Sequence, residues 1–130
     1  MKIVKVKLSR DASKTYEYIK KNKKVIHQSF IRKKELVKQN IHYGDPIAKS
    51  KFPKRYKTQY KITNLFRAEI ADFWRFLYTL TQGKSQDEII VFILDITSHK
   101  KYNKIFGYRN LIIAESYSKD AYFLQITGKI

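Results

Sequence analysis

A group of titratable side chains directly follows the most apolar stretch of the chain. The apolar stretch covers residues 88–97, and the polar group after it is Ser98, His99, Lys100, Lys101 and Tyr102. A histidine changes its charge near neutral pH, so His99 can serve as a base or an acid. Arg75 offers a planar, permanently charged fork whose shape suits a phosphate. These residue types indicate proton transfer next to a bound phosphate.

Each of these side chains also has a purely structural interpretation. His99 could end a strand and hydrogen-bond to the backbone, and Arg75 could be an exposed charge paired across a sheet. We favour the phosphate role for Arg75 because it lies opposite an aromatic face of its own strand. For His99 the residues alone favour the structural interpretation.

A predicted β-hairpin positions these residues. Two runs rich in β-branched and aromatic side chains, residues 73–80 and 88–97, flank a polar turn that contains glycine. Alternate side chains of a strand face opposite ways, so Arg75 points away from the face formed by Trp74, Phe76, Tyr78 and Leu80. Because residues 88–97 are apolar on both faces, we expect this strand to be central in its sheet.

The preceding part of the chain predicts one strand, two helices and a further strand. Residues 2–8 alternate between apolar residues and lysines, as in a half-buried strand. Helices are predicted over about 11–21, with Ser9 or Asp11 as the cap, and over about 25–40. Another strand is predicted over 58–66, followed by a connection over 67–72.

These elements predict an α+β fold in the order β-α-α-β-β-β. The sheet is small and antiparallel or mixed, with an N-terminal helical hairpin packed on one face. We expect one domain over residues 1–130, with a core of about 1–108 and an extension of unknown role over 109–130.

Positive charge is concentrated in the first half of the chain. The formal net charge is +17. Residues 1–61 hold 19 basic and 4 acidic residues, a net +15, whereas residues 62–130 have a net +2. Such an uneven excess of positive charge favours a polyanionic partner, and nucleic acid is the most natural one.

Residues 47–61 combine basic residues with aromatic ones, a pattern that can meet both phosphates and bases. The RNA-binding candidates in this segment are Lys49, Lys51, Lys54 and Arg55. Its tyrosines, Tyr56 and Tyr60, could equally be core residues.

Composition also excludes several classes of site. The chain has no cysteine, so disulfides and thiolate metal sites are excluded, and a reducing compartment is the simplest expectation. No apolar run approaches the roughly 20 residues of a membrane span. We expect a cytoplasmic protein with no membrane contact and no cofactor. No metal site is expected either, because His27 and His42 are far apart in the sequence and lack nearby ligand spacing.

Three acidic residues in or beside the apolar stretch are not expected to be catalytic. Asp95 lies within the apolar run and is expected to be buried or at an edge with a hydrogen-bond partner, not catalytic. Asp87 and Glu88 open the strand and are expected to be solvated.

The sequence resembles the RelE/ParE superfamily of toxins from type II toxin–antitoxin modules. The order and spacing of four segments carry this resemblance over roughly residues 1–108. The segments are Asn40 to Ile47, Tyr60-Lys61-Ile62, Trp74 to Tyr78, and Ile96 to Tyr102. The family's RelE-like members are ribonucleases that cleave mRNA, typically on the ribosome, whereas its ParE-like members act on DNA gyrase.

The resemblance assigns roles to individual residues. Arg75 matches the family's strand arginine, and Lys100 matches its basic residue at the end of the next strand, where an amine stabilises phosphate charge. His99 gains a role in proton transfer. Tyr102, or Tyr108 if the longer spacing applies, would stack on a base or help to move a proton.

One further match lies on the basic segment. Lys61 matches a basic strand position of the family and is an RNA-binding candidate together with Tyr108. The next alternate position is Thr63, where several members have lysine, which weakens the case for a multi-lysine mechanism.

The implied function is a metal-independent endoribonuclease that cleaves mRNA, with the ribosome and a neighbouring acidic antitoxin as partners. The alternative is a non-catalytic member of the same fold, either a gyrase-inhibiting toxin or a basic module that binds RNA or the ribosome. Arg75, His99 and the following Lys-Lys-Tyr favour the enzyme, because a binding protein needs the charge but not the histidine.

Overall fold

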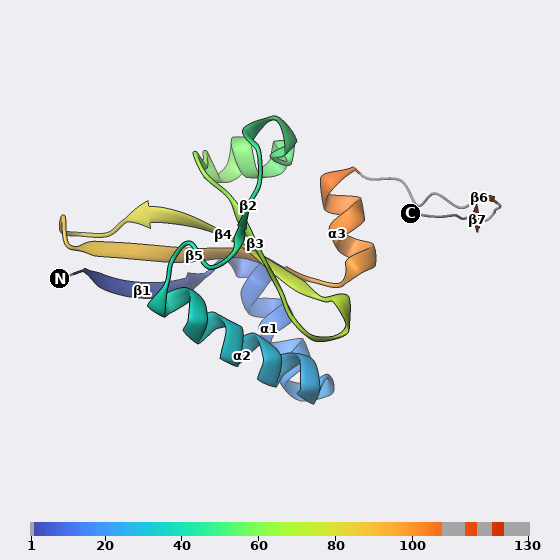
Figure 1. The fold of residues 1–130 in the computed structure, drawn as a ribbon, viewed down its shortest axis with the longest axis horizontal. Helices are drawn as coiled ribbons and strands as arrows, with labels where there is room; N and C mark the ends of the chain where they lie inside the picture. The colour runs from blue at the N-terminus through green and yellow to red at the C-terminus, as the bar shows by residue number, and fades with distance from the viewer. Residues whose placement is uncertain (1, 108–113, 117–120, 124–130) are drawn as a thin grey trace. The chain divides into compact units, whose positions relative to one another are not determined.

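The computed structural model describes residues 2–107, 114–116 and 121–123 (Figure 1). The chain divides into two compact units, Met1–His99 and Lys100–Ile130. The second unit contains most of α3 (His99–Phe106) and the antiparallel pair β6 (Ala114–Ser116) and β7 (Ala121–Phe123). Whether residues 1–130 act as one domain stays a prediction.

The first unit is built on a five-stranded mixed sheet with the order β1-β5-β4-β3-β2. The strands are β1 (Ile3–Leu8), β2 (Asp45–Pro46), β3 (Phe66–Glu69), β4 (Arg75–Gln82) and β5 (Glu88–Thr97). β1 runs parallel to β5, and the other neighbours are antiparallel. The predicted α+β class and β-α-α-β-β-β order are confirmed, with the two-residue β2 as an addition.

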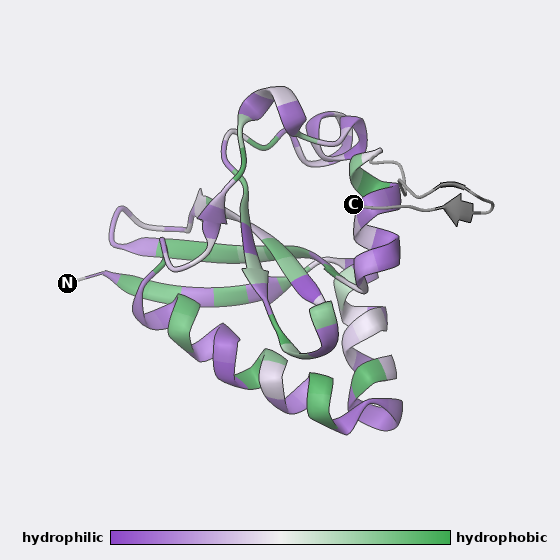
Figure 2. Cartoon of the chain, turned by 45° about the vertical axis from the view of Figure 1, so that its right-hand side comes forward, coloured by the Kyte–Doolittle hydropathy of each residue, from purple (hydrophilic) through white to green (hydrophobic). Residues whose placement is uncertain are grey.

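Two helices, α1 (Arg10–Asn22) and α2 (Lys24–Gln39), provide the apolar residues that cover one face of the sheet. The Ser9 hydroxyl caps α1 by accepting a hydrogen bond from the Ala12 amide at 3.0 Å. Along α2, apolar and polar residues alternate with helical spacing (Figure 2), and Phe30 meets Phe76 of β4 edge to face at 5.1 Å. Phe76 and Tyr78 are fully buried here, as the predicted alternation of β4 requires.

The opposite face of the sheet is packed against the segment between β2 and β3. This segment contains the 3₁₀ turn η1 (Lys49–Lys51) and the π-helix η2 (Tyr56–Tyr60). Tyr56 is fully buried, and the ring of Tyr60 lies 5.4 Å from that of Phe92 on β5. Both tyrosines therefore pack against the sheet. Of the two interpretations that the sequence allowed for them, RNA stacking or the core, this arrangement matches the core.

The predicted strand over 58–66 is wrong. Tyr56–Tyr60 is helical, Lys61 has a left-handed φ of 51°, and the strand begins only at Phe66. β3 therefore includes the first half of the predicted connection over 67–72. The physical reason is the spacing of Tyr56 and Tyr60, which are four residues apart and so share one helical face that can pack against the sheet.

Two smaller expectations also need correction. β5 has the predicted bounds and is an inner strand, but β4 occupies the middle of the sheet. Glu88 is not solvated: it is only 8% exposed, pairs with Lys5 at 2.8 Å and accepts the Lys84 amide at 2.7 Å. β1 lies beside β5 and brings Lys5 to the Glu88 carboxylate, which the sequence-based expectation did not consider.

Within the described residues, no helix is both long enough and apolar enough to cross a membrane.

Candidate active site

Arg75 and His99 meet at one end of the sheet. Arg75 opens β4 and is paired with Glu69 of β3 on one side and Thr97 of β5 on the other. His99 follows Thr97 by two residues and is the first residue of α3. The register therefore brings the two side chains together, and Arg75 Nη2 lies 3.3 Å from His99 Nδ1.

The two side chains differ in their exposure to solvent. Arg75 is buried, at 7% exposure, whereas His99 is exposed. Residues directly opposite each other in an antiparallel pair share a face, so Arg75 and Thr97 lie on the sheet face opposite the helices. The predicted orientation of Arg75 away from the aromatic core is confirmed.

The pKa of His99 is lowered below its ordinary value. Partial burial is the largest cause and the positive charge of Arg75 the second, while Glu69 acts in the opposite direction. His99 is therefore mostly neutral at pH 7. Because a guanidinium can only donate, Arg75 donates to Nδ1, which leaves the proton of the neutral ring on Nε2.

The other predicted catalytic residues lie in the second unit. Lys100 directly follows His99, and Tyr102 stacks on Phe106 within α3 at a centroid distance of 4.5 Å. Their roles stay predictions. Tyr108, the alternative to Tyr102 and an RNA-binding candidate, lies outside the described residues.

The predicted RNA-binding lysines are all exposed and lie on the segment that covers the second sheet face. Lys49 and Lys51 belong to η1, Lys54 precedes η2 and Lys61 follows it. Arg55 differs from them because it forms ion pairs with Asp95 at 2.6 Å and with Asp11 at 3.2 Å. Its charge is therefore partly used within the protein.

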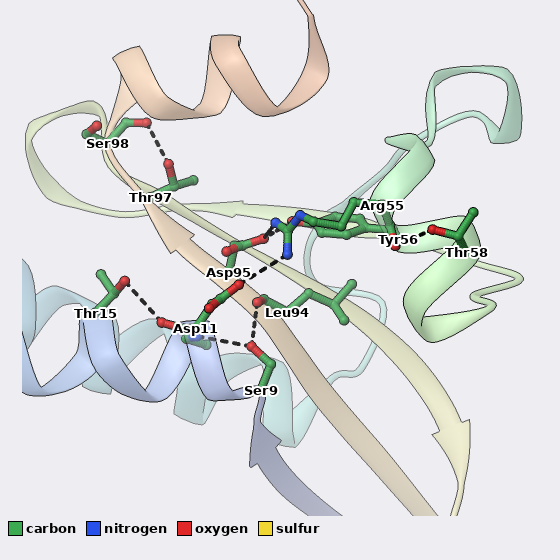
Figure 3. Close-up of polar contacts among 11 residues, drawn as sticks. Ser9, Asp11, Thr15, Arg55, Tyr56, Thr58, Leu94, Asp95, Thr97 and Ser98 are labelled. Carbon is green, nitrogen blue, oxygen red and sulfur yellow. Dashed lines mark hydrogen bonds and ion pairs between the residues drawn. The ribbon is translucent and has the colours of Figure 1, made fainter.

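A buried polar cluster on the same sheet face was missed by the sequence analysis (Figure 3). The Asp95 side chain, only 3% exposed, accepts hydrogen bonds from the Tyr56 hydroxyl and from Arg55. Burial raises the pKa of Tyr56 far above its usual range, and the neighbouring Asp95 carboxylate raises it further. The expectation that Asp95 is buried with a hydrogen-bond partner is confirmed.

A β-bulge places Asp95 on this face. Leu77 pairs with Asp95 but Tyr78 pairs with Ile93, so Leu94 is an extra residue in β5. The Ser9 amide donates to the Ile93 carbonyl at 2.9 Å, and the Ser9 hydroxyl donates to the Leu94 carbonyl at 2.6 Å. The helix cap of α1 thus also satisfies the backbone of the bulge.

The signal for this cluster was present in the sequence. Apart from Glu88 at its start, the ten-residue strand β5 has Asp95 as its one charged residue, and a buried carboxylate requires a donor or a cation. Which donor it finds depends on the fold, because Tyr56 is 39 residues away in the chain.

Among the described residues, no group of three or more His, Cys, Asp or Glu side chains could hold a metal ion. The rings of His27 and His42 instead contact aromatic rings, those of Tyr16 at 5.1 Å and Phe66 at 5.7 Å.

Comparison with known proteins identifies the fold. No protein-family model and no curated protein matches the sequence. Among solved structures, the chain is similar to a YoeB/ParE toxin from Agrobacterium tumefaciens, with a TM-score of 0.55 and 11% sequence identity. The match covers 73% of this chain and 98% of the toxin. At this level of identity, the similarity shows a shared fold.

Proposed function

We propose that this protein, whose fold is that of a YoeB/ParE toxin, is the toxin of a type II toxin–antitoxin module and cleaves mRNA without a metal ion, on the ribosome. The observation that carries the proposal is the contact between Arg75 and His99 at 3.3 Å. In this contact a guanidinium, whose planar fork suits a phosphate, lies beside an imidazole that is mostly neutral at pH 7. A protein that only binds nucleic acid does not need such a pair.

The geometry suggests how a substrate would activate the pair. In the free protein Arg75 occupies the lone pair of His99 Nδ1. A phosphate draws the guanidinium fork toward its oxygens, because charge-assisted pairs with phosphate are strong. This movement frees Nδ1 to accept a proton, so that the base becomes available when the substrate is bound.

The proposed reaction is attack of the ribose 2′-oxygen on the adjacent phosphorus. His99 takes the 2′-hydroxyl proton, Arg75 stabilises the charge on the phosphate, and the bond to the 5′-oxygen breaks. A proton must then reach the leaving 5′-oxygen. By the resemblance of the sequence, Lys100 adds positive charge and Tyr102 assists this proton transfer.

A toxin with this charge needs a neutralising partner in its own cell. The net charge of +17 favours rapid binding of an acidic protein. We therefore include a small acidic antitoxin, encoded next to this chain, as the protein partner.

Expression of the chain in bacteria tests the function. We expect growth to stop, and the 5′ ends of transcripts to map inside translated reading frames. Co-expression of the acidic neighbour should restore growth, and the two proteins should elute together in size-exclusion chromatography at moderate salt. Harmless expression with intact transcripts would contradict the proposal and favour the non-catalytic RNA-binding alternative.

Binding of RNA should weaken steeply as salt is added. The logarithm of the binding constant is expected to fall by about 0.7 per phosphate contact for each tenfold rise in salt. Replacing Lys49, Lys51, Lys54 and Lys57 by alanine should reduce this slope by up to about 3. Lys57 is exposed and replaces Arg55 in this set because Arg55 forms ion pairs within the protein.

A second quadruple variant provides the control for charge. Replacing the exposed residues Lys20, Lys21, Lys23 and Lys24 removes the same charge from the turn between α1 and α2. If the control flattens the slope and the first variant does not, the RNA-binding surface lies on the helices.

A further inference from the structure

Phe73 is the most exposed of the large apolar side chains in the described residues. It lies at the tip of the hairpin between β3 and β4 and is 77% exposed. Its φ of 61° and the φ of 57° at Asp72 are both in the left-handed region, which residues other than glycine rarely adopt. An apolar side chain held outside the protein by a strained backbone requires an explanation beyond stability.

The backbone around Phe73 is fixed on both sides. The Ile70 amide donates to the Trp74 carbonyl at 2.8 Å, and the Trp74 amide donates to the Ala71 carbonyl at 3.1 Å. The Ala71 amide donates to the hydroxyl of Ser29 on α2 at 3.0 Å. Ile70 is buried and Trp74 packs against the core. The Phe73 ring is thus presented from a rigid support.

The ring is also close to the proposed catalytic pair. Phe73 precedes Arg75 by two residues, so their Cα atoms lie within about 7 Å of each other. Arg75 in turn contacts His99. A strand of RNA whose phosphate lies at Arg75 therefore has a neighbouring base within reach of the tip of the hairpin.

We infer that Phe73 is a stacking platform for a base of the bound RNA next to the cleaved phosphate. This inference deepens the proposed function and rests on it. An aromatic face binds any base by stacking, and a rigid ring loses little freedom when the base arrives. The adjacent, exposed Asp72 carboxylate repels phosphate, so the strand presents a base to the ring instead of its backbone.

A protein partner fits this site less well. Protein interfaces depend on clusters of anchor residues in desolvated pockets. The other large exposed apolar side chains of the described residues each belong to a different part of the chain: Ile3, Tyr18, Val25 and Tyr43. A single exposed ring at the tip of the hairpin suits one base.

Substitution of Phe73 by glycine distinguishes the effect of losing the ring from the effect of disturbing the left-handed backbone. Phe73→Gly removes the ring and suits the left-handed conformation, so the variant should melt at or above the wild-type temperature. Phe73→Trp keeps a stacking surface. Tyr18→Ala, on α1, is the matched control because it removes an exposed aromatic ring from another element.

The substrate is a short mRNA with one cleavage site, presented on ribosomes, together with versions that lack the base on either side of that site. We expect Phe73→Gly to lower kcat/KM on the intact RNA by about 5- to 150-fold, the range of one base–aromatic stack. Phe73→Trp and Tyr18→Ala should cleave like the wild type. On one of the abasic RNAs, wild type and Phe73→Gly should cleave equally well.

Equal cleavage of the intact RNA by wild type and Phe73→Gly would overturn the inference. It would also be overturned if Phe73→Gly lost the same factor in kcat/KM on the intact RNA and on both abasic RNAs. A binding measurement with the same RNAs, made uncleavable by a 2′-deoxyribose, separates this result from failure of the proposed function. If wild type cleaves nothing but the base-dependent loss appears in binding, the function fails and the stacking inference stands. If neither cleavage nor binding depends on the ring, the platform is excluded.

Discussion

Replacing either Arg75 or His99 should lower the rate of RNA cleavage by about 10²- to 10⁴-fold while the protein stays folded. Arg75 stabilises charge on the phosphate and His99 moves a proton, and the two side chains lie 3.3 Å apart. Because the two side chains act as a unit, the double variant should cleave RNA only slightly more slowly than the less active of the two single variants. The measurement is single-turnover cleavage of a defined mRNA on ribosomes.

Variants that preserve size keep this test clear. Arg75 is buried, so Arg75→Lys and Arg75→Gln are preferable to alanine, and thermal melting must accompany the rates. Arg32→Gln and His42→Gln are matched controls at exposed positions. Full activity of folded Arg75→Gln and His99→Gln would show that the site assignment is wrong. Because the proposed mechanism uses no metal held by this protein, treating the purified protein with a chelator before it is added to the ribosomes should leave the wild-type rate unchanged.

The pH dependence of cleavage should reflect the lowered pKa of His99. A base must be neutral, so activity is expected to be complete above the ordinary histidine pKa of about 6.5 and to fall only at lower pH. Arg75→Gln removes a positive charge that lowers this pKa. The imidazole signal of His99 in NMR should therefore titrate at higher pH in Arg75→Gln than in wild type, even if the variant no longer cleaves RNA.

Replacing Asp95 should produce the largest loss of stability. Asp95→Ala removes the acceptor for the buried Tyr56 hydroxyl and one ion-pair partner of Arg55. Breaking a buried pair typically costs about 3–5 kcal/mol. Since the Arg55 side chain is 38% exposed and can be rehydrated, we expect a value near the lower end, about 3 kcal/mol, in urea unfolding.

Asp11 supplies the control, because it pairs with the same arginine from an exposed position. Its side chain is 49% exposed, against 3% for Asp95. Asp11→Ala should therefore cost only about 0–1 kcal/mol. In a double-mutant cycle, Tyr56→Phe should reduce the cost of Asp95→Ala, because no hydroxyl is then left without an acceptor. Equal, small losses for both aspartates would show that the buried cluster contributes little to stability.

Local patterns in the sequence determined much of the architecture. The predicted helices over 11–21 and 25–40 correspond to Arg10–Asn22 and Lys24–Gln39, and the apolar strand has its predicted bounds. The alternation around Arg75 also identified its face. These features depend on residues close together in the chain, whose spacing decides which side chains can be buried together.

Tertiary contacts decided where the polar residues of β5 lie. Strict alternation would place Asp95 on the helix face together with Ile93, but the extra residue at Leu94 moves Asp95 and Thr97 to the face of Arg75. Ser9 supports this bulge from 85 residues away.

Tertiary contacts also decided the conformation of the segment before β3. Its basic and aromatic composition indicated RNA binding, and a strand was predicted over 58–66. Tyr56 and Arg55 are instead directed inward by the buried Asp95 carboxylate of β5. The sequence by itself determined the two N-terminal helices and the three longest strands of the sheet, and it indicated that Asp95 is buried or at an edge with a hydrogen-bond partner. The choice of its partners required the tertiary structure, because a buried carboxylate binds whichever donors the fold brings to it.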